Sequence, residues 1–130
     1  MKADAFSQWL GIEVLDVSFG YCKIKMQVRE QMVNGFRTAH GGIAFSFADS
    51  AFAFACNSDG YINVALDVST SFTKPVVVGD VLTAEAKQLV KTNKTGVYTV
   101  EVTNASGDLV CFFKGTCYRT EKRLIDVSAK

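Results

Sequence analysis

Asp49 is the residue of this sequence whose position most needs a chemical explanation. It stands midway along an alanine- and phenylalanine-rich segment, residues 43–57, in which almost every other residue is apolar. An ionised carboxylate in such surroundings is costly unless it is paired, so its pKa should rise. A carboxylate of that kind can serve as a general base or a nucleophile. The alternative is that Asp49 points to water, in a narrow polar stripe with Ser46 and Ser50.

A second candidate group, His40, Gly41 and Gly42, stands directly before the apolar segment. The first amides of a helix have no partners within the helix and lie at the positive end of its dipole. Glycine there lets a ligand oxygen approach the backbone closely, so the pair of glycines indicates an oxyanion hole. The same glycines would also suit a tight strand-to-helix turn, and a single histidine is often a structural group rather than a catalytic one.

The spacing between these two groups limits how they can cooperate. Gly41 and Asp49 are eight residues apart, which corresponds to about 12 Å along a helix axis. One carbonyl group cannot contact both of them in one chain. If the two act together, they come from different subunits whose helices run antiparallel, and we therefore expect a two-fold dimer with paired sites.

The rest of the chain must position the apolar segment, and it consists mostly of strand patterns. Alanine favours helix and the segment is too long for a strand, so it predicts one helix that is buried on almost every side. A short amphipathic helix is expected at residues 3–10. Strands are expected at residues 12–19, 21–29, 61–73, 81–90, 97–104 and 109–118. These elements predict an α+β fold of the hotdog type, in which five or six antiparallel strands wrap one long central helix.

The predicted strand at residues 61–73 alternates more regularly than the others. One face should carry larger side chains, from Ile62, Val64, Leu66, Val68, Thr70 and Phe72. The other face should carry smaller ones, from Asn63, Ala65, Asp67, Ser69, Ser71 and Thr73. A face of small residues either contacts solvent or lets another backbone approach. We expect this strand to pair with its own copy across the dimer axis.

Composition excludes several classes of protein. A chain of 130 residues with 48% hydrophobic and 21% charged residues is typical of one soluble globular domain, residues 1–130. Its net charge of +1 supplies no field that would recruit nucleic acid or a membrane surface. The four cysteines and one histidine lack metal-ligand spacing, so neither a metal nor a cofactor is expected.

The cellular location is expected to be the cytoplasm. The four cysteines could form two disulfides, but buried reduced thiols are favoured in a chain with its own core. Residues 41–58 are the most membrane-like stretch, yet they contain too many polar residues for a good span. The N-terminal residues do not have the pattern of a signal peptide.

Several motifs together resemble the hotdog-fold acyl-CoA thioesterases, in particular the branch that acts in phenylacetate degradation. The motifs are NG at 34–35, HGG at 40–42, AD at 48–49 and AFACN at 53–57. The segment at 67–75, the strand start at 95–98 and the overall length also fit, so the resemblance covers nearly the whole chain.

The resemblance implies an enzyme that hydrolyses a thioester to a free acid and coenzyme A. It implies that Asp49 activates water or attacks the thioester itself. Gly41 then donates its amide to the thioester oxygen and His40 helps shape the pocket, while Asn34 holds the carbonyl or the water. Relatives place the acid of one subunit opposite the glycine and asparagine of the other, which implies a homodimer with shared sites and a dimer of dimers. Where some branches carry a serine or threonine beside the water, this chain has Ala65.

Coenzyme A also requires cations for its phosphates and a slot for its pantetheine arm. The resemblance places the arm beside residues 73–75 and the turn at 91–95. Lys91, Lys94 and Arg119 are the expected phosphate partners, although loop lysines are commonly only solvated. The complete expected substrate-binding set is Gly42, Ala65, Thr73, Lys74, Pro75, Lys91, Asn93, Lys94 and Arg119. Most phenylalanines of the helix should be core, and one or two could line a pocket for an aromatic or a short- to medium-chain acyl group.

Two other functions fit the same fold. A 3-hydroxyacyl dehydratase would need a histidine paired with the helix acid and a proline- and glycine-rich loop around it, whereas the single proline, Pro75, is far from His40. A non-catalytic acyl-CoA sensor would keep the cleft without needing Asp49. Replacement of Asp49 separates the enzyme from the sensor, because only the enzyme would bind its ligand and fail to turn it over.

Overall fold

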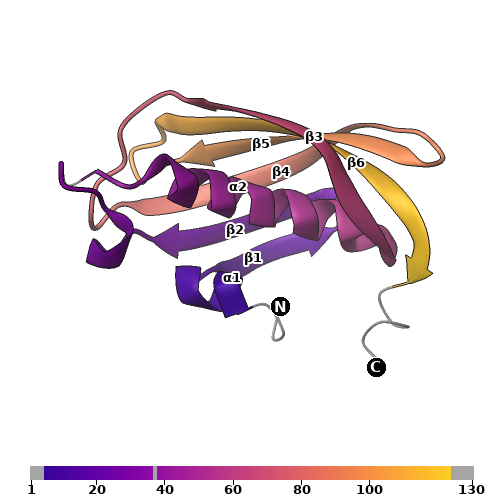
Figure 1. The fold of residues 1–130 in the computed structure, drawn as a ribbon, viewed down its shortest axis with the longest axis horizontal. Coiled ribbons are helices and arrows are strands. Elements are labelled where there is room, and N and C mark those ends of the chain that lie inside the picture. The colour runs from indigo at the N-terminus through magenta and orange to yellow at the C-terminus, as the bar shows by residue number, and fades with distance from the viewer. Residues whose placement is uncertain (1–4, 37, 124–130) are drawn as a thin grey trace.

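A six-stranded antiparallel sheet curls around one long helix in the computed structural model, which describes residues 5–36 and 38–123 (Figure 1). The strands are β1 (Glu13–Ser18), β2 (Tyr21–Gln27), β3 (Tyr61–Phe72), β4 (Val81–Lys91), β5 (Thr95–Thr103) and β6 (Leu109–Arg123). The helices are α1 (Ala5–Leu10) and α2 (Gly41–Cys56), with short 3-10 turns η1 (Glu30–Met32) and η2 (Asn57–Asp59). The predicted α+β architecture is confirmed, and each predicted strand is present.

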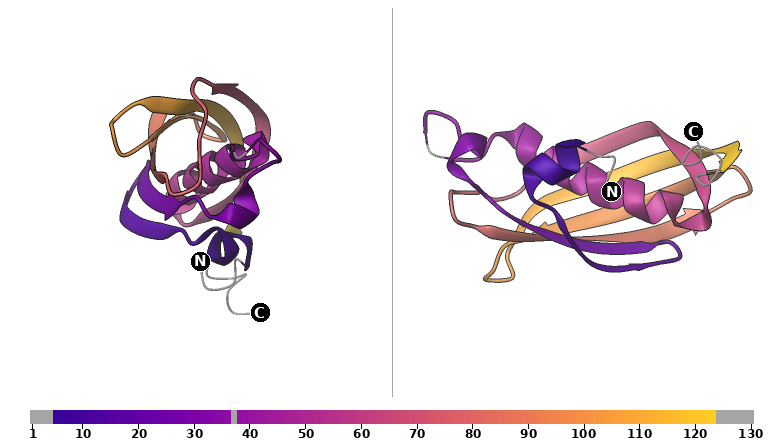
Figure 2. Two further views of the ribbon diagram at one scale, coloured as in Figure 1. Left: turned by 90° about the vertical axis from the view of Figure 1, so that its left-hand side faces the viewer. Right: turned by 90° about the horizontal axis from the view of Figure 1, so that it is seen from below.

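The strand order β1-β2-β4-β5-β6-β3 explains how α2 comes to lie inside the sheet. After β2 the chain leaves the sheet, runs through α2, and returns as β3 at the opposite edge. The helix therefore crosses the concave face between the two edges, and the end-on view of Figure 2 shows the sheet curving around it. Within the described residues β1 and β3 are the two edge strands.

One face of α2 packs into the core of the protein. Its buried residues follow the helical spacing of an amphipathic stripe: Ala44, Phe47, Ala48, Ala51, Phe52, Ala55 and Cys56. The alanines let the helix approach the sheet closely, and the ring of Phe52 lies 5.5 Å from that of Phe113 and 5.8 Å from that of Tyr98. Burial of one such ring contributes about 1.5–3 kcal/mol.

The opposite face of α2 is only half-buried, so the prediction of burial on almost every side is wrong for the single chain. Ser46, Asp49, Ser50 and Ala53 lie on this partly open side, whereas half-buried Phe45 and Phe54 flank the core and pack against it. The physical reason is that one sheet covers only the part of the helix circumference that faces it. The small and polar side chains on the other part are only half-buried by the described residues of this chain.

The prediction of two unbroken faces on β3 is also wrong. Ala65 pairs with Cys117 and Asp67 with Thr116, so Leu66 is an additional residue in a β-bulge. Residues directly opposite one another in an antiparallel pair point to the same side. Ala65, although exposed, therefore lies on the same side of the sheet as buried Cys117, and Val68, which packs against the core, lies on that side too. The bulge shifts the alternation by one residue, which a regular sequence pattern does not reveal.

The four cysteines are free and buried. Among residues 5–36 and 38–123, no cluster of His, Cys, Asp and Glu side chains has an arrangement that could hold a metal ion. No helix in the same ranges combines the length and the apolar character that a membrane crossing requires.

Candidate active site

The first turn of α2 is held in place by the loop that leads into it. The amide of Ala39 donates to the carbonyl of Val76 at 2.6 Å, and the amide of His40 donates to the carbonyl of Met32 at 3.0 Å. The loop is thus bonded on one side to the segment before β4 and on the other to η1. These contacts fix the point at which the helix begins.

Gly41 is the first residue of α2, and its amide lies at an uncapped helix end. The side chain of His40, at the N-cap, makes no capping hydrogen bond, and the first turn contains no acidic residue. The positive end of the helix dipole is therefore not compensated by this turn, which favours a negatively charged or carbonyl oxygen beside it. A Cβ at position 41 would lie 3.3 Å from the ring of Phe72, so this ring covers one side of Gly41.

A pocket of about 410 Å³ opens in front of this turn. Its wall includes His40 and Gly41 from the helix start and the consecutive residues Thr73, Lys74 and Pro75 from the loop after β3. The pocket is completed by Thr38, Ala39, Ala44, Phe72, Val76 and Val110. The structure thus brings together the predicted oxyanion group and the predicted pantetheine loop, although they are far apart in the sequence.

Asp49 lies two helical turns further along α2, on its half-buried face. Burial raises the pKa of its carboxyl above the usual value. No hydrogen bond or ion pair joins this carboxyl to another residue of the described chain. It does not line the pocket at Gly41, in agreement with the axial spacing of about 12 Å. Within one chain, the candidate base is therefore separated in space from the candidate oxyanion donors.

The remaining residues of the predicted site differ in what surrounds them. Asn34 is half-buried in the loop before α2, and its side-chain oxygen accepts hydrogen bonds from that loop. A Cβ on Gly42 would meet nothing within 4 Å, so no residue of the described chain crowds that position. Ala65 lies on β3 and offers no hydrogen-bonding side chain for a water.

Lys94 and Arg119 meet at the opposite end of α2. The amide of Arg119 donates to the carbonyl of Lys94 at 2.7 Å, and its guanidinium lies 4.5 Å from the ring centre of Tyr61. Asn63, which pairs with Arg119 across the sheet, donates to the carbonyl of Cys56 at the end of α2. A second pocket of about 650 Å³ is lined by Tyr61, Lys94, Tyr118, Arg119, Thr120, Glu121 and Lys122.

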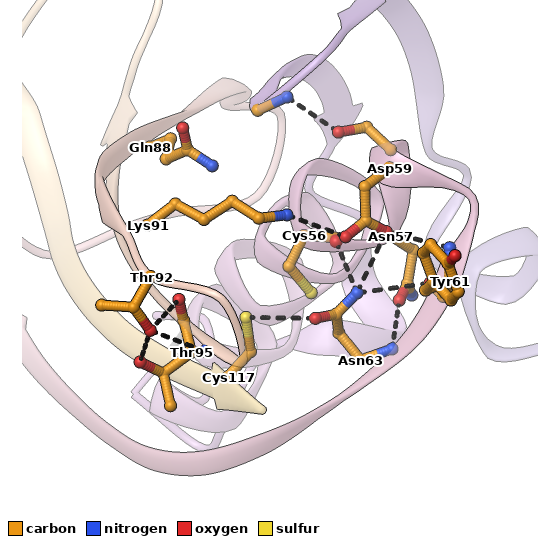
Figure 3. A network of polar contacts seen from close by, with 12 residues as sticks. Cys56, Asn57, Asp59, Tyr61, Asn63, Gln88, Lys91, Thr92, Thr95 and Cys117 are labelled. Atoms are coloured by element: carbon orange, nitrogen blue, oxygen red, sulfur yellow. Dashed lines mark hydrogen bonds and ion pairs between the residues drawn. The ribbon is translucent and has the colours of Figure 1, made fainter. Parts of the chain in front are cut away.

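Lys91, the third predicted cation, forms an ion pair with Asp59 at 2.9 Å (Figure 3). The side chain of Asp59 is only 7% exposed. Burial alone would raise its pKa, but hydrogen bonds from Lys91, from the amide of Tyr61 and from Asn63 outweigh burial and hold the pKa below its usual value. The ammonium of Lys91 thus ties η2 to β4, and its contact with a phosphate stays a prediction. Asn93 is exposed in the turn after β4 and stays a predicted substrate-binding residue.

Sequence reasoning missed six residues that line the first pocket, and Phe72 and Thr38 are the two of them that bear on the site. Phe72 was assigned only to a strand face, and Thr38 was not assigned at all, yet both line the pocket beside Gly41. No spacing rule links Phe72 to Gly41, because the two residues come into contact only in the folded chain. The only signal for Thr38 is its place between the NG and HGG motifs.

The similarity of this chain to known proteins decides its family. Residues 36–111 match the model of the thioesterase superfamily. The acyl-coenzyme A thioesterase PaaI of Escherichia coli is 40% identical over 116 residues, which cover 89% of this chain and 83% of that protein. The chain belongs to the thioesterase superfamily. The resemblance to its PaaI-like, hotdog-fold branch is confirmed.

Solved structures of this superfamily have the same fold. The E. coli PaaI protein from the phenylacetic acid degradation operon superposes with a TM-score of 0.92 at 38% identity, covering 94% of this chain and 88% of that one. A thioesterase of Streptococcus pneumoniae, solved with coenzyme A, superposes with a TM-score of 0.83 at 28% identity, covering 86% of this chain and 88% of the other. This chain is therefore an enzyme of the thioesterase superfamily.

Proposed function

We propose that this chain hydrolyses acyl-coenzyme A thioesters to a free acid and coenzyme A. The observation that carries the proposal is the uncapped start of α2 at Gly41, which opens into a pocket bordered by Thr73, Lys74 and Pro75. Such a site offers a donor for the thioester oxygen and a channel for a slender arm in one place. The names of the E. coli and S. pneumoniae relatives support coenzyme A thioesters as the substrate class.

Gly41 and Asn34 stabilise the charge that develops during the reaction. When the carbonyl carbon is attacked, its oxygen becomes negative, and the amide of Gly41 donates a hydrogen bond to it at the positive end of the helix dipole. The side-chain amide of Asn34 supplies a second donor. His40, at the N-cap, shapes the pocket around them.

Asp49 supplies the base or the nucleophile. As a base, its carboxylate takes a proton from a water molecule while the water oxygen bonds to the carbonyl carbon. The tetrahedral intermediate then collapses, the carbon–sulfur bond breaks, and the leaving sulfur of coenzyme A takes up a proton. As a nucleophile, the carboxylate attacks the carbon directly and water later hydrolyses the resulting anhydride. In both routes the partly buried, unpaired carboxylate is more basic than an ordinary aspartate.

Each site needs two chains, because Gly41 and Asp49 are separated by about 12 Å on one helix. We infer that β3 pairs with β3 of a second copy and brings the two α2 helices antiparallel. Two features support this pairing. β3 is a long edge strand on which Val64 is 45% and Leu66 59% exposed, and the face of α2 that bears Asp49 is only half-covered.

The same antiparallel arrangement explains the position of the cations. Lys94 and Arg119 lie at the C-terminal end of α2, so in the dimer they approach the helix start of the other chain. There they can bind the phosphates of a coenzyme A whose arm follows Thr73 to Pro75. Phe45 lies one turn before Asp49 and is half-buried, and its ring offers a surface for an aromatic or a short- to medium-chain acyl group.

The direct test is a thiol-release assay with aromatic, short-chain and long-chain acyl-coenzyme A esters. We expect the wild type to release thiol, most rapidly from the aromatic or shorter esters. Asp49→Asn keeps the shape of the side chain but removes the base, and should lose about 10²- to 10⁴-fold in kcat while still binding the ester. The proposal is refuted if the wild type hydrolyses none of these esters. It is also refuted if Asp49→Asn hydrolyses them at a near-native rate.

A further inference from the structure

The side-chain oxygen of Asn34 is surrounded by donors from its own loop. It accepts hydrogen bonds from the amide of Phe36 at 2.9 Å, from the amide of Thr38 at 3.4 Å and from the hydroxyl of Thr38 at 3.2 Å. The backbone amide of Asn34 in turn donates to the carbonyl of Thr38 at 2.8 Å. A carboxamide oxygen has two lone pairs, so three donors use its accepting capacity completely.

These contacts determine which end of the Asn34 amide faces outward. A rotation by 180° would bring the NH2 group against three donors and lose every one of these bonds, so the oxygen is held inward. The nitrogen Nδ2 is consequently turned away from the loop. No residue in the described part of the chain accepts a hydrogen bond from it, although the side chain is half-buried. As far as the described residues go, its two N–H groups are thus available to a ligand.

Thr38 is the residue of this loop that connects the asparagine to the pocket. Its hydroxyl donates to Asn34, and its backbone forms a β-bridge to Val77. It also lines the pocket with His40 and Gly41. Of the three donors to the Asn34 oxygen, two are backbone amides. The Thr38 hydroxyl is therefore the donor that a single side-chain substitution can remove.

We propose that Thr38 is a positioning residue of the active site: together with the two backbone amides, its hydroxyl holds the Asn34 amide in the orientation in which Nδ2 donates to the thioester carbonyl. The inference rests on the proposed function, in which Asn34 is that donor. Thr38 itself does not need to touch the reacting atoms. Its contribution is to fix the donor before the charge develops, so that no reorientation is required in the transition state.

Four variants of the full chain test this inference: Thr38→Val, Thr38→Ser, Asn34→Ala and the double variant Thr38→Val with Asn34→Ala. Valine matches the shape of threonine but cannot donate, so kcat should fall about 3- to 10-fold, the effect of one neutral hydrogen bond, while KM stays within about twofold. Serine retains the hydroxyl and should stay near the wild type. Asn34→Ala should lose about 10²-fold in kcat, and Thr38→Val should add no further loss in that background.

Each contrary outcome has a distinct meaning. A Thr38→Val protein with wild-type kcat overturns the inference, as does a Thr38→Ser protein as impaired as Thr38→Val. A loss from Thr38→Val that is equally large without Asn34 also overturns it, because Thr38 would then act by another route. Near-native kcat in Asn34→Ala removes the proposed role of Asn34 itself, and with it the basis of this inference. Unfolding curves of all four variants identify any change that reflects stability.

Discussion

Two aspartates of this chain have opposite pKa shifts because their surroundings differ. Asp49 is half-buried and forms no ion pair with another residue among those described, and burial raises its pKa. Asp59 is also half-buried but receives hydrogen bonds from Lys91, from the amide of Tyr61 and from Asn63, which lower its pKa. A carboxylate that is costly to ionise and has no partner is suited to accept a proton, whereas a paired one is suited to hold structure together.

The pH dependence of catalysis follows from the raised pKa of Asp49. The reaction needs the ionised carboxylate, so kcat/KM should increase as the pH rises through the pKa of this group. Because burial raises that pKa, the midpoint of the acid limb should lie above the usual value for an aspartate. A pH profile measured with one aromatic acyl-coenzyme A ester checks this. A midpoint at the ordinary aspartate value would contradict the assignment.

The positive charges of Lys94 and Arg119 should contribute to binding the nucleotide phosphates of the substrate. We expect Lys94→Ala and Arg119→Ala each to raise KM for acyl-coenzyme A esters about tenfold, the effect of a charge-assisted hydrogen bond reduced by solvent. KM for acyl-pantetheine esters, which lack the phosphates of the nucleotide, should stay the same. Lys114→Ala removes an exposed lysine of β6 outside the second pocket and serves as the control. An equal rise in KM for both substrate types would contradict phosphate binding.

At the scale of the elements, the Lys91–Asp59 ion pair closes the end of α2 onto the sheet (Figure 3). The pKa of Asp59 is lowered in the folded protein. The stability that its ionised form supplies is therefore present above the pKa of the unfolded chain. It is lost as the pH falls through the folded-state pKa.

Asp59→Asn should lower the free energy of unfolding by about 2 kcal/mol at neutral pH, because a nearly buried, charge-assisted contact is lost. The difference from the wild type should shrink as the solution is acidified, and denaturant unfolding at several pH values measures it. Asp108→Asn, which breaks the exposed pair with Lys74, is the control and should have little effect. A constant difference at all pH values would contradict the linkage.

The elements could be predicted from local pattern, whereas contacts between distant elements could not. Alanine content and length placed the helix at residues 43–57, within two residues of α2 at either end. The alternation of β3 located the strand but not its faces, because an inserted residue such as Leu66 leaves the sequence pattern unchanged. Lys91 was assigned to a phosphate, since nothing in a single sequence pairs it with Asp59, 32 residues away.

The same limit applies to the candidate site. Asp49, His40 and Gly41 could be identified from residue type and spacing, because one charge in an apolar helix and two glycines before it are local features. Their relation to residues 73–75 came only through the resemblance, and the pocket that joins them requires the folded sheet. The hydrogen bonds that orient Asn34 depend on loop geometry, which residue types alone do not specify.

At the scale of the whole molecule, the proposed mechanism makes the single chain incomplete as a catalyst. The proposed donor Gly41 and the proposed base Asp49 occupy one helix about 12 Å apart, whereas a donor must lie about 3 Å from the developing charge. The second copy that we propose would cover both the open edge of β3 and the half-covered face of α2. The proposed activity therefore depends on the assembly of two chains as much as on any single side chain.

Complementation between two inactive proteins tests the shared site most directly. Asp49→Asn removes the base and Asn34→Ala removes a donor of the carbonyl, and each homodimer should be nearly inactive. If each site takes Asp49 from one chain and Asn34 with Gly41 from the other, a mixed dimer has one site with both native partners. Subunit exchange should then restore thiol release, up to about half of the native rate per mixed dimer. If mixing restores no activity although exchange is demonstrated, each site is built within one chain and the account is wrong.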